Sequence, residues 1–401
     1  MTDLQVSPRI RRARTAVAVA FFVNGLCFAS WISRTPAVRD TLGLSSAQLG
    51  LLLLCVSVGS IAGLPLSGPI VHRLGARFAV LGGSLTVGVG LIGLGIALVL
   101  VSVPVAVPGL VLVGLGIGTW DVAMNVEGAD VERRLGRPLM PRLHAGFSLG
   151  TVAGAGIGAA AAATGVPLPV QVFVVAVVAP IAMAVATRFF VLERAELEAG
   201  EPRRSNVLTA WREPRTLLVG VMVLGFAFTE GSANDWMAVA MVDGYGTSEA
   251  IGAVGFGVFV AAMTVARMFG GAALERYGRV PTLRATAVLG LAGLLLVLLG
   301  GSAPVAIAGA VLWGFGAALG FPVGMSAAAD DPERAAVRVS VVSSIGYTAF
   351  LAGPPLIGLL AEHVGILRGL FVVVAALTLG LVACGASRPL PATAVGGVER
   401  H

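Results

Sequence analysis

The chain has 401 residues, of which 57% are hydrophobic and only 12% are charged, against roughly 25% charged residues in an ordinary soluble domain. This balance excludes a soluble globular protein and indicates an integral membrane protein. All 27 basic residues are arginine, and the net charge is +6. Because the arginines are scattered over short loops, they suit anionic lipid headgroups, and nucleic acid is not an expected partner.

Apolar stretches long enough to cross a bilayer follow one another along the chain. Three charge-free stretches, residues 78–120, 145–187 and 285–329, are each about twice the ~20 residues that one span needs. Each is interrupted by Gly, Ser or Pro, so each is predicted to be two helices joined by a tight turn. Single spans are predicted at residues 15–33, 45–71, 216–242, 251–274, 339–361 and 365–386. The prediction is an all-α membrane protein with twelve transmembrane helices.

The distribution of arginine predicts which side of the membrane each loop faces. If the N-terminus is cytoplasmic, only Arg34, Arg39 and Arg368 lie outside, which favours a multi-pass inner (plasma) membrane protein with both termini in the cytoplasm. The first apolar segment has no small-residue cleavage site, so we expect a retained span. The expected organisation is an N-terminal tail (1–14), a six-helix bundle (15–192), a cytoplasmic linker (193–215), a second six-helix bundle (216–387) and a C-terminal tail (388–401).

The two halves match each other at an offset of about 200 residues. HAGFSLGTVAGAGIG, from residue 144, aligns with SIGYTAFLAGPPLIG, from residue 344. GPIVHRLGAR, from residue 68, aligns in the same way with GAALERYGRV, from residue 271. Because each half has an even number of spans, the two six-helix repeats are parallel, as in transporters whose substrate site lies between the halves near the membrane midplane.

The second match resembles the signature loop of the major facilitator superfamily, between spans 2 and 3, with its weaker copy between spans 8 and 9. That loop usually reads Gly, three residues, Asp-Arg, one residue, Gly-Arg, and His72 stands here where Asp is usual. The resemblance covers nearly the whole chain. The GPP motif at residues 353–355 is similar to the corresponding segment of fucose-permease-like members. It implies a monomer with a charge latch on the cytoplasmic face. The candidate gating or charge-pair residues are Arg73, Gly75, Arg267, Glu275, Arg276, Gly278 and Arg279.

Two acids lie deep inside predicted spans, Asp121 in span 4 and Glu230 in span 7. A charge at the bilayer centre costs about 2.5 to 3.5 kcal/mol on insertion scales, so such residues are functional candidates. Each has an asparagine four positions later, on the same helix face. Because a carboxylate without water binds a proton more readily, we expect proton coupling here; the alternative is a structural pair. The candidate substrate-binding or proton-coupling residues are Asp121, Asn125, Glu230, Asn234, Asp235 and Asn24.

Arg267 is the only basic residue deep within a predicted span, since Arg368 lies at the outer end of the last one. Three interpretations stay open for it: a pair with an acid of span 7, a pair with Glu275, or binding of an anionic substrate. A pair that is structural or gating is favoured.

Other patterns predict packing. A glycine at every fourth position from Gly146 to Gly158 forms a small-residue stripe that lets membrane helices approach closely; it is also loosely similar to the span-5 signature of proton-coupled drug exporters. Four tryptophans near predicted span ends are expected to anchor the chain at the membrane interface: Trp31, Trp120, Trp236 and Trp313. Trp120 and Trp236, each beside an acid, have stacking on a ring-shaped ligand as the alternative.

The expected function is secondary active transport of a small solute by alternating access, coupled to protons. Efflux of amphipathic compounds and uptake of a sugar-like metabolite are both open. An uncoupled facilitator, or a transporter-shaped receptor or scaffold without turnover, is the alternative. An enzyme is not expected, because no nucleophile and base share helical spacing. No cofactor is expected either: GVGLIG at residues 88–93 matches a dinucleotide fingerprint but lies inside a charge-free span, and the sequence has no phosphate loop for ATP and no paired-His metal motif.

Overall fold

The computed structural model describes residues 7–136, 139–191, 207–331 and 334–389. Most of the predicted linker, most of the predicted C-terminal tail and the first part of the predicted N-terminal tail therefore lie outside the described residues. Within these residues, 12 helical segments are long and apolar enough to cross a membrane. This confirms the all-α fold and the number of spans.

Most spans are single helices: α1 (Pro8–Ile32), α3 (Ser46–Leu74), α4 (Ala76–Leu100), α5 (Val103–Leu135), α6 (Met140–Ala163), α7 (Leu168–Ala186), α9 (Pro214–Tyr245), α10 (Glu249–Tyr277), α11 (Arg279–Leu299) and α14 (Ala335–Val364). Two spans are interrupted: α12 (Ala303–Ala317) continues as α13 (Gly320–Ala328), and α15 (Ile366–Gly369) continues as α16 (Phe371–Ala383) and η3 (Cys384–Ser387). Two short helices that the sequence does not predict lie between spans, α2 (Thr35–Leu42) and α8 (Val207–Ala210), and η1 (Thr187–Phe189) continues α7 at the end of the sixth span.

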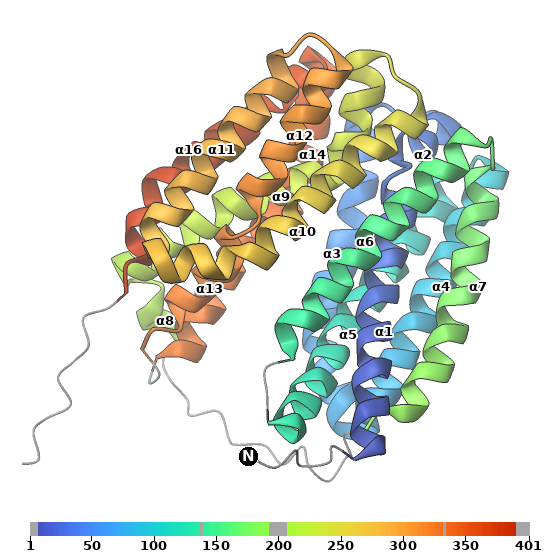
Figure 1. The fold of residues 1–401 in the computed structure, drawn as a ribbon. Coiled ribbons are helices and arrows are strands. Elements are labelled where there is room, and N and C mark those ends of the chain that lie inside the picture. The colour runs from blue at the N-terminus through green and yellow to red at the C-terminus, as the bar shows by residue number, and fades with distance from the viewer. Residues whose placement is uncertain (1–6, 137–138, 192–206, 332–333, 390–401) are drawn as a thin grey trace, which may run out of the picture.

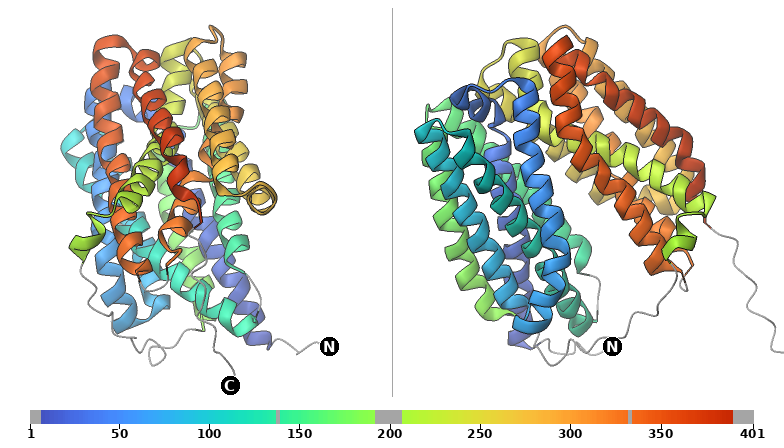
Figure 2. Two further views of the ribbon diagram at one scale, coloured as in Figure 1. Left: turned by 90° about the vertical axis from the view of Figure 1, so that its left-hand side faces the viewer. Right: turned by 180° about the vertical axis from the view of Figure 1, so that it is seen from behind.

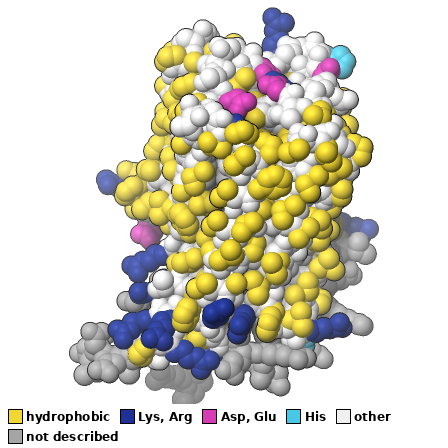
Figure 3. Space-filling model, turned by 90° about the vertical axis from the view of Figure 1, so that its right-hand side faces the viewer, with side chains coloured by type: hydrophobic (Ala, Val, Ile, Leu, Met, Phe, Trp, Pro, Cys, Tyr) yellow, Lys and Arg dark blue, Asp and Glu magenta, His cyan; other side chains and the backbone are white. Residues whose placement is uncertain are grey.

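The spans form two groups, one from α1 to α7 and one from α9 to α16 (Figures 1 and 2). The groups meet at one end of the molecule, where α3 packs against α14 and α6 against α10, and they diverge toward the end at which α1 begins. Figure 3 shows arginine side chains gathered at this second end, below a broad apolar belt. We call the two ends the closed end and the arginine-rich end.

Close backbone approach joins the two groups at the closed end. A Cβ atom added to Gly50 of α3 would overlap the carbonyl oxygen of Pro354 in α14, and one added to Gly358 would lie 2.6 Å from the carbonyl oxygen of Ser46. α14 remains one helix across Pro354 and Pro355. The two helices therefore touch with no room for side chains at these glycines.

The glycine stripe of α6 allows close helix packing, as the sequence predicts, and the helix that it contacts is α1. A Cβ atom at Gly154 would lie 2.6 Å from the carbonyl oxygen of Leu26, and one at Gly150 would overlap the carbonyl oxygen of Phe22. Glycine on the facing helix contributes too, because a Cβ atom at Gly25 would overlap Phe147. Backbones this close gain van der Waals contact that larger side chains would prevent.

Replacing Gly150 by leucine should therefore lower the free energy of unfolding by about 1 to 3 kcal/mol, the usual cost of overpacking. The matched control is Gly156→Leu on the same helix, where a Cβ atom would meet nothing within 4 Å. Thermal unfolding in detergent should show a lower midpoint for the first variant and a native one for the second. Equal midpoints would mean that the α1–α6 contact is not tight.

The prediction that tryptophans anchor the chain at the membrane interface is wrong. All four are buried, with Trp120, Trp236 and Trp313 at 0% exposure. The reason is space left by glycine on neighbouring helices: a Cβ atom at Gly83 would lie 2.9 Å from the Cβ atom of Trp120. Trp313 packs edge-on against Phe259, with ring centroids 5.7 Å apart. The indoles fill the bundle cores.

Candidate functional site

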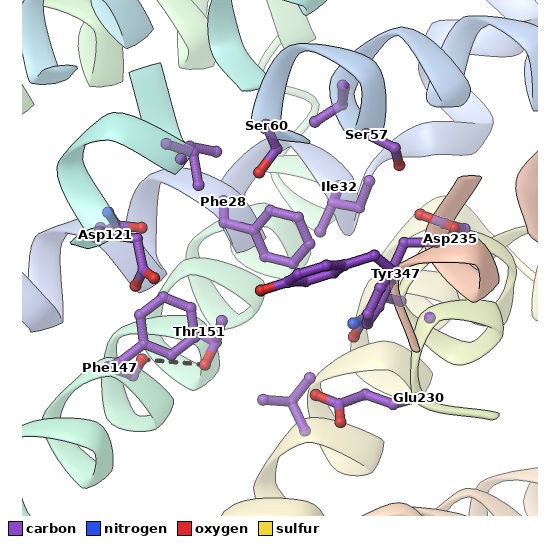
Figure 4. A pocket seen from close by; sticks show the side chains of 18 of the residues that line it. Phe28, Ile32, Ser57, Ser60, Asp121, Phe147, Thr151, Glu230, Asp235 and Tyr347 are labelled. Atoms are coloured by element: carbon purple, nitrogen blue, oxygen red, sulfur yellow. Dashed lines mark hydrogen bonds between the residues drawn. The ribbon is translucent and has the colours of Figure 1, made fainter. Parts of the chain in front are cut away.

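A cavity of about 370 Å³ lies between the two groups of helices, within the usual size range of small-molecule sites. The helices α1, α3, α5 and α6 line it from one side, and α9, α10 and α14 from the other. Asp121 and Glu230 lie on opposite sides, and the ring of Tyr347 reaches between them (Figure 4). The structure thus brings together Arg267 and all but one of the candidate substrate-binding or proton-coupling residues: Asn24, Asp121, Glu230, Asn234 and Asp235. Trp120 and Trp236, the candidates for ring stacking, do not line this cavity.

Asp121 and Asn125 share one face of α5, as their spacing predicts. The Nδ2 atom of Asn125 donates to the backbone carbonyl of Asp121 at 2.8 Å and to its Oδ1 at 3.4 Å. Asn125 itself does not line the cavity. Its contact helps to orient the Asp121 carboxylate, and in the described part of the chain no arginine pairs with this acid.

Glu230 of α9 is paired with Arg267 of α10, the first of the three interpretations of this arginine. The Nη2 atom of Arg267 donates to both carboxylate oxygens, each at 2.9 Å. The Arg267 side chain is 32% exposed and that of Glu230 is 17% exposed, so the pair is accessible from the cavity. The predicted alternative pair with Glu275 is not formed.

A break in the tenth span holds Arg267 in place. Because Pro322 has no backbone N–H, it cannot donate to the carbonyl of Ala318, four residues earlier. That carbonyl, at the junction of α12 and α13, accepts instead from the Nε atom of Arg267 at 3.2 Å. The proline in the sequence thus creates a backbone acceptor that orients the arginine toward Glu230.

Several other polar groups of the cavity have no partner among the described residues. Asn24 of α1 is 1% exposed, and neither its Nδ2 nor its Oδ1 atom has a hydrogen bond there. A buried amide left unpaired costs about 1 to 3 kcal/mol. The carboxylate of Asp235 also faces the cavity without a described partner (Figure 4). Unsatisfied groups of this kind indicate a place where a ligand or water binds.

The remaining lining combines hydroxyl groups with aromatic rings, and sequence reasoning missed these residues. The hydroxyls come from α3 and α6, and the rings from both halves: Ser57, Ser60, Ser148, Thr151, Phe28, Phe147, Tyr347 and Phe350. Serine and phenylalanine are common in membrane helices, so no local pattern distinguishes them. Their placement provides apolar faces and hydrogen-bonding groups in one cavity.

Two ion pairs, also missed by the sequence analysis, join the halves at the closed end. Arg34 donates from Nη2 to Glu249 at 3.0 Å, and its Nη1 is held by the carbonyl of Val166 at 2.8 Å. Arg39 pairs with both carboxylate oxygens of Asp243. Each pair connects residues more than 200 positions apart, so no local signal predicts it.

The two signature loops differ in their contacts. Gly75 and Gly278 have positive φ angles of 87° and 81°, which explains glycine at both positions. In the second loop Arg279 binds Asp330 at 2.7 Å, and Asp330 also binds Arg215 at 2.7 Å. All three belong to the second group of helices or its connections, so this cluster does not join the two groups here. Three other candidates of the latch have no described ion pair: Arg73, Glu275 and Arg276.

A second cluster at the arginine-rich end surrounds Glu213, just before α9. Its carboxylate accepts from Arg338 at 2.6 Å and from Arg334 at 3.0 Å. The Arg338 guanidinium holds the pKa of Glu213 below its usual value, and partial burial opposes this only in part. The folded chain therefore gains stability from this group above its unfolded pKa of about 4.3, and loses it as the pH falls through the folded value.

Replacing Glu213 by glutamine should lower the unfolding temperature near pH 7, and the difference from the native chain should shrink below about pH 4. Thermal unfolding in detergent across this range measures both. A difference that stays constant from about pH 3 to pH 7 would contradict the assignment.

The twelve spans and the polar cavity between two halves define a multi-pass membrane transporter of small molecules. The family model of the Major Facilitator Superfamily matches residues 3–134 and 232–395, and the chain belongs to this superfamily, whose members are transporters and not enzymes. An uncharacterized MFS-type transporter of Yersinia pestis is 31% identical over 358 residues, which are 89% of this chain and 91% of that protein.

Solved structures share the fold. The nucleoside transporter NupG superposes with a TM-score of 0.73 and 13% identity, over 94% of this chain and 98% of that one. The Escherichia coli fucose:proton symporter FucP superposes with a TM-score of 0.62 and 12% identity, over 93% of this chain and 98% of that one.

Proposed function

We propose that the chain is a proton-coupled secondary transporter that moves a small solute through the central cavity by alternating access. The observation that carries this proposal is one cavity with carboxylates from both halves, Asp121 from α5 and Glu230 and Asp235 from α9. The moving halves are residues 15–192 and 216–387. The arginine-rich end is cytoplasmic, in agreement with the positive-inside rule, and the molecule described here is the form closed toward the outside.

Glu230 and Asp121 are the proposed coupling groups. In this form Arg267 neutralises Glu230, so proton binding to Glu230 would dissolve the pair and release the arginine into the cavity. Intramembrane carboxylates of this kind serve as proton relays in transporters. The proton would bind or leave Glu230 according to the side of the membrane to which the cavity is open. Asn24, Asn234 and Asp235 are the proposed hydrogen-bonding groups for the solute, and Asn125 positions Asp121.

The proposed solute has an apolar face and a hydrogen-bonding face. Aromatic rings such as Phe28 and Tyr347 suit the first, and the unpaired Asn24 suits the second. Sugars and nucleosides have this character, and the nucleoside transporter NupG and the fucose:proton symporter FucP share this fold. Amphipathic drugs also combine an apolar face with a hydrogen-bonding face, so the test includes them together with sugars and nucleosides.

The test is counterflow in proteoliposomes with a panel of sugars, nucleosides and amphipathic compounds. We expect one class to exchange, and Asp235→Asn, which changes a proposed solute-binding acid of the cavity, to reduce its exchange at least about tenfold, since a lost charged hydrogen bond is worth about 1.5 to 3 kcal/mol. Asp40→Asn, which changes an exposed acid of α2, is the matched control. Saturable binding without exchange would contradict transport and favour a receptor.

A further inference from the structure

A second groove lies far from the central cavity, on the outer surface between α1 and α7 at the arginine-rich end. Its volume is about 650 Å³, and η1 completes its wall. Figure 1 shows α1 and α7 side by side there, and the two helices are in contact. Nothing in the proposed transport cycle uses this groove.

The groove changes from basic to apolar along its length. Arg11, Arg12 and Arg14 of α1 lie at its outer end, and Val19 lies two turns deeper. Eight residues from Arg11 to Val19 correspond to about 12 Å along the helix. This is the polarity of an amphiphile whose charged head is at the membrane surface and whose chain points inward.

The facing wall continues the same pattern. Ile181, Val185 and Phe189 recur every four residues along α7 and η1, and their side chains are 59%, 52% and 42% exposed. The small Ala182 leaves space between them at the floor of the groove. An acyl chain fits against such a surface, whereas a free phosphate ion would contact only the arginines.

The three arginines have no acidic partner among the described residues. In the part of the chain that the structure describes, no carboxylate pairs with Arg11, Arg12 or Arg14. Unpaired guanidinium groups at the membrane surface attract lipid phosphates, at about 1 kcal/mol each. Basic pockets between transmembrane helices bind anionic headgroups in this way.

We infer that this groove is a binding site for an anionic phospholipid, with its phosphate on the arginines of α1 and an acyl chain on the apolar wall of α7. The site is separate from the transport path, so it does not depend on the identity of the solute. Its ligand is a structural lipid of the leaflet that contacts the arginine-rich end.

Native mass spectrometry of the full chain, released from detergent with phosphatidylglycerol or phosphatidylcholine, tests this. The native chain should retain phosphatidylglycerol preferentially, and Arg11→Gln/Arg12→Gln/Arg14→Gln should weaken retention on the order of 100-fold, as three contacts predict. The charge-matched control replaces Arg77, Arg212 and Arg284, all exposed and outside the groove, by glutamine. Ala182→Phe, which fills the floor and keeps every charge, should also reduce retention.

Several outcomes would overturn the inference. Equal loss in the control triple variant would mean that only overall charge matters. Competition by free glycerol phosphate as strong as that by the lipid would mean a phosphate site without an acyl chain. Unchanged retention in the groove variant would mean that the lipid binds elsewhere on the chain.

Discussion

The double substitution Glu230→Gln/Arg267→Gln should recover most of the folding stability that Glu230→Gln alone loses, yet it should not restore proton movement. The single variant leaves Arg267 without its carboxylate. Fully buried pairs lose about 3 to 5 kcal/mol when one partner is removed. Because Arg267 is 32% exposed, solvent screening reduces this, and we expect about 1 to 3 kcal/mol. Removing both charges eliminates the unpaired cation.

This comparison separates a structural pair from a coupling pair. Thermal unfolding in detergent reports stability, and a pH-sensitive dye in proteoliposomes reports proton movement. Recovery will be incomplete, because the Ala318 carbonyl loses its donor from Arg267. If the double variant regains both stability and substrate-driven proton movement, Glu230 is only a structural partner of Arg267, and the proposed coupling role is wrong.

Breaking the closed-end ion pairs should open the cavity toward the outside. Glu249→Gln with Asp243→Asn removes both pairs that join the halves there, those of Arg34 and Arg39. The arginines are largely buried, at 6% and 15% side-chain exposure, so each pair is worth more than a surface pair. A bias of about 1.4 kcal/mol shifts the ratio of the two forms tenfold.

Labelling of a cysteine inside the cavity measures this shift. In a chain whose three native cysteines are replaced by alanine, Ser57→Cys places a thiol on the cavity wall. An impermeant maleimide added from outside should label the double variant about tenfold faster than the parent. Asp40→Asn is the matched control, because Asp40 binds Arg39 at 2.7 Å from the same helix and does not connect the halves. An equal increase in the control would contradict a gate at the closed end.

Much of the fold follows from local sequence signals. Charge-free length predicts the spans, and glycines at turns, such as Gly165 and Gly301 with φ angles of 72° and 69°, mark where hairpins reverse. The cost of an intramembrane charge directs attention to Asp121 and Glu230, and the cavity brings both together. Helical spacing also anticipates the contact of Asn125 with Asp121.

The remaining features depend on partners distant in the sequence. In the sequence, Arg34 and Arg39 look like ordinary arginines of an outside loop, because the acids with which they pair belong to the other half. The tryptophans were misassigned because position near a span end does not report the glycines on the neighbouring helix. One missed feature, the acceptor for Arg267, had a local signal. A proline within a predicted span, here Pro322, leaves the carbonyl four residues earlier, that of Ala318, without its helical donor.

The most direct test of coupling is the substrate-evoked pH change in dye-loaded proteoliposomes, compared between the native chain and Glu230→Gln, with counterflow measured in the same preparations. We predict a pH change with the native chain, none with the variant, and counterflow in both. A pH change of equal size in both proteins, or flux without any pH change in the native chain, would contradict proton coupling at Glu230.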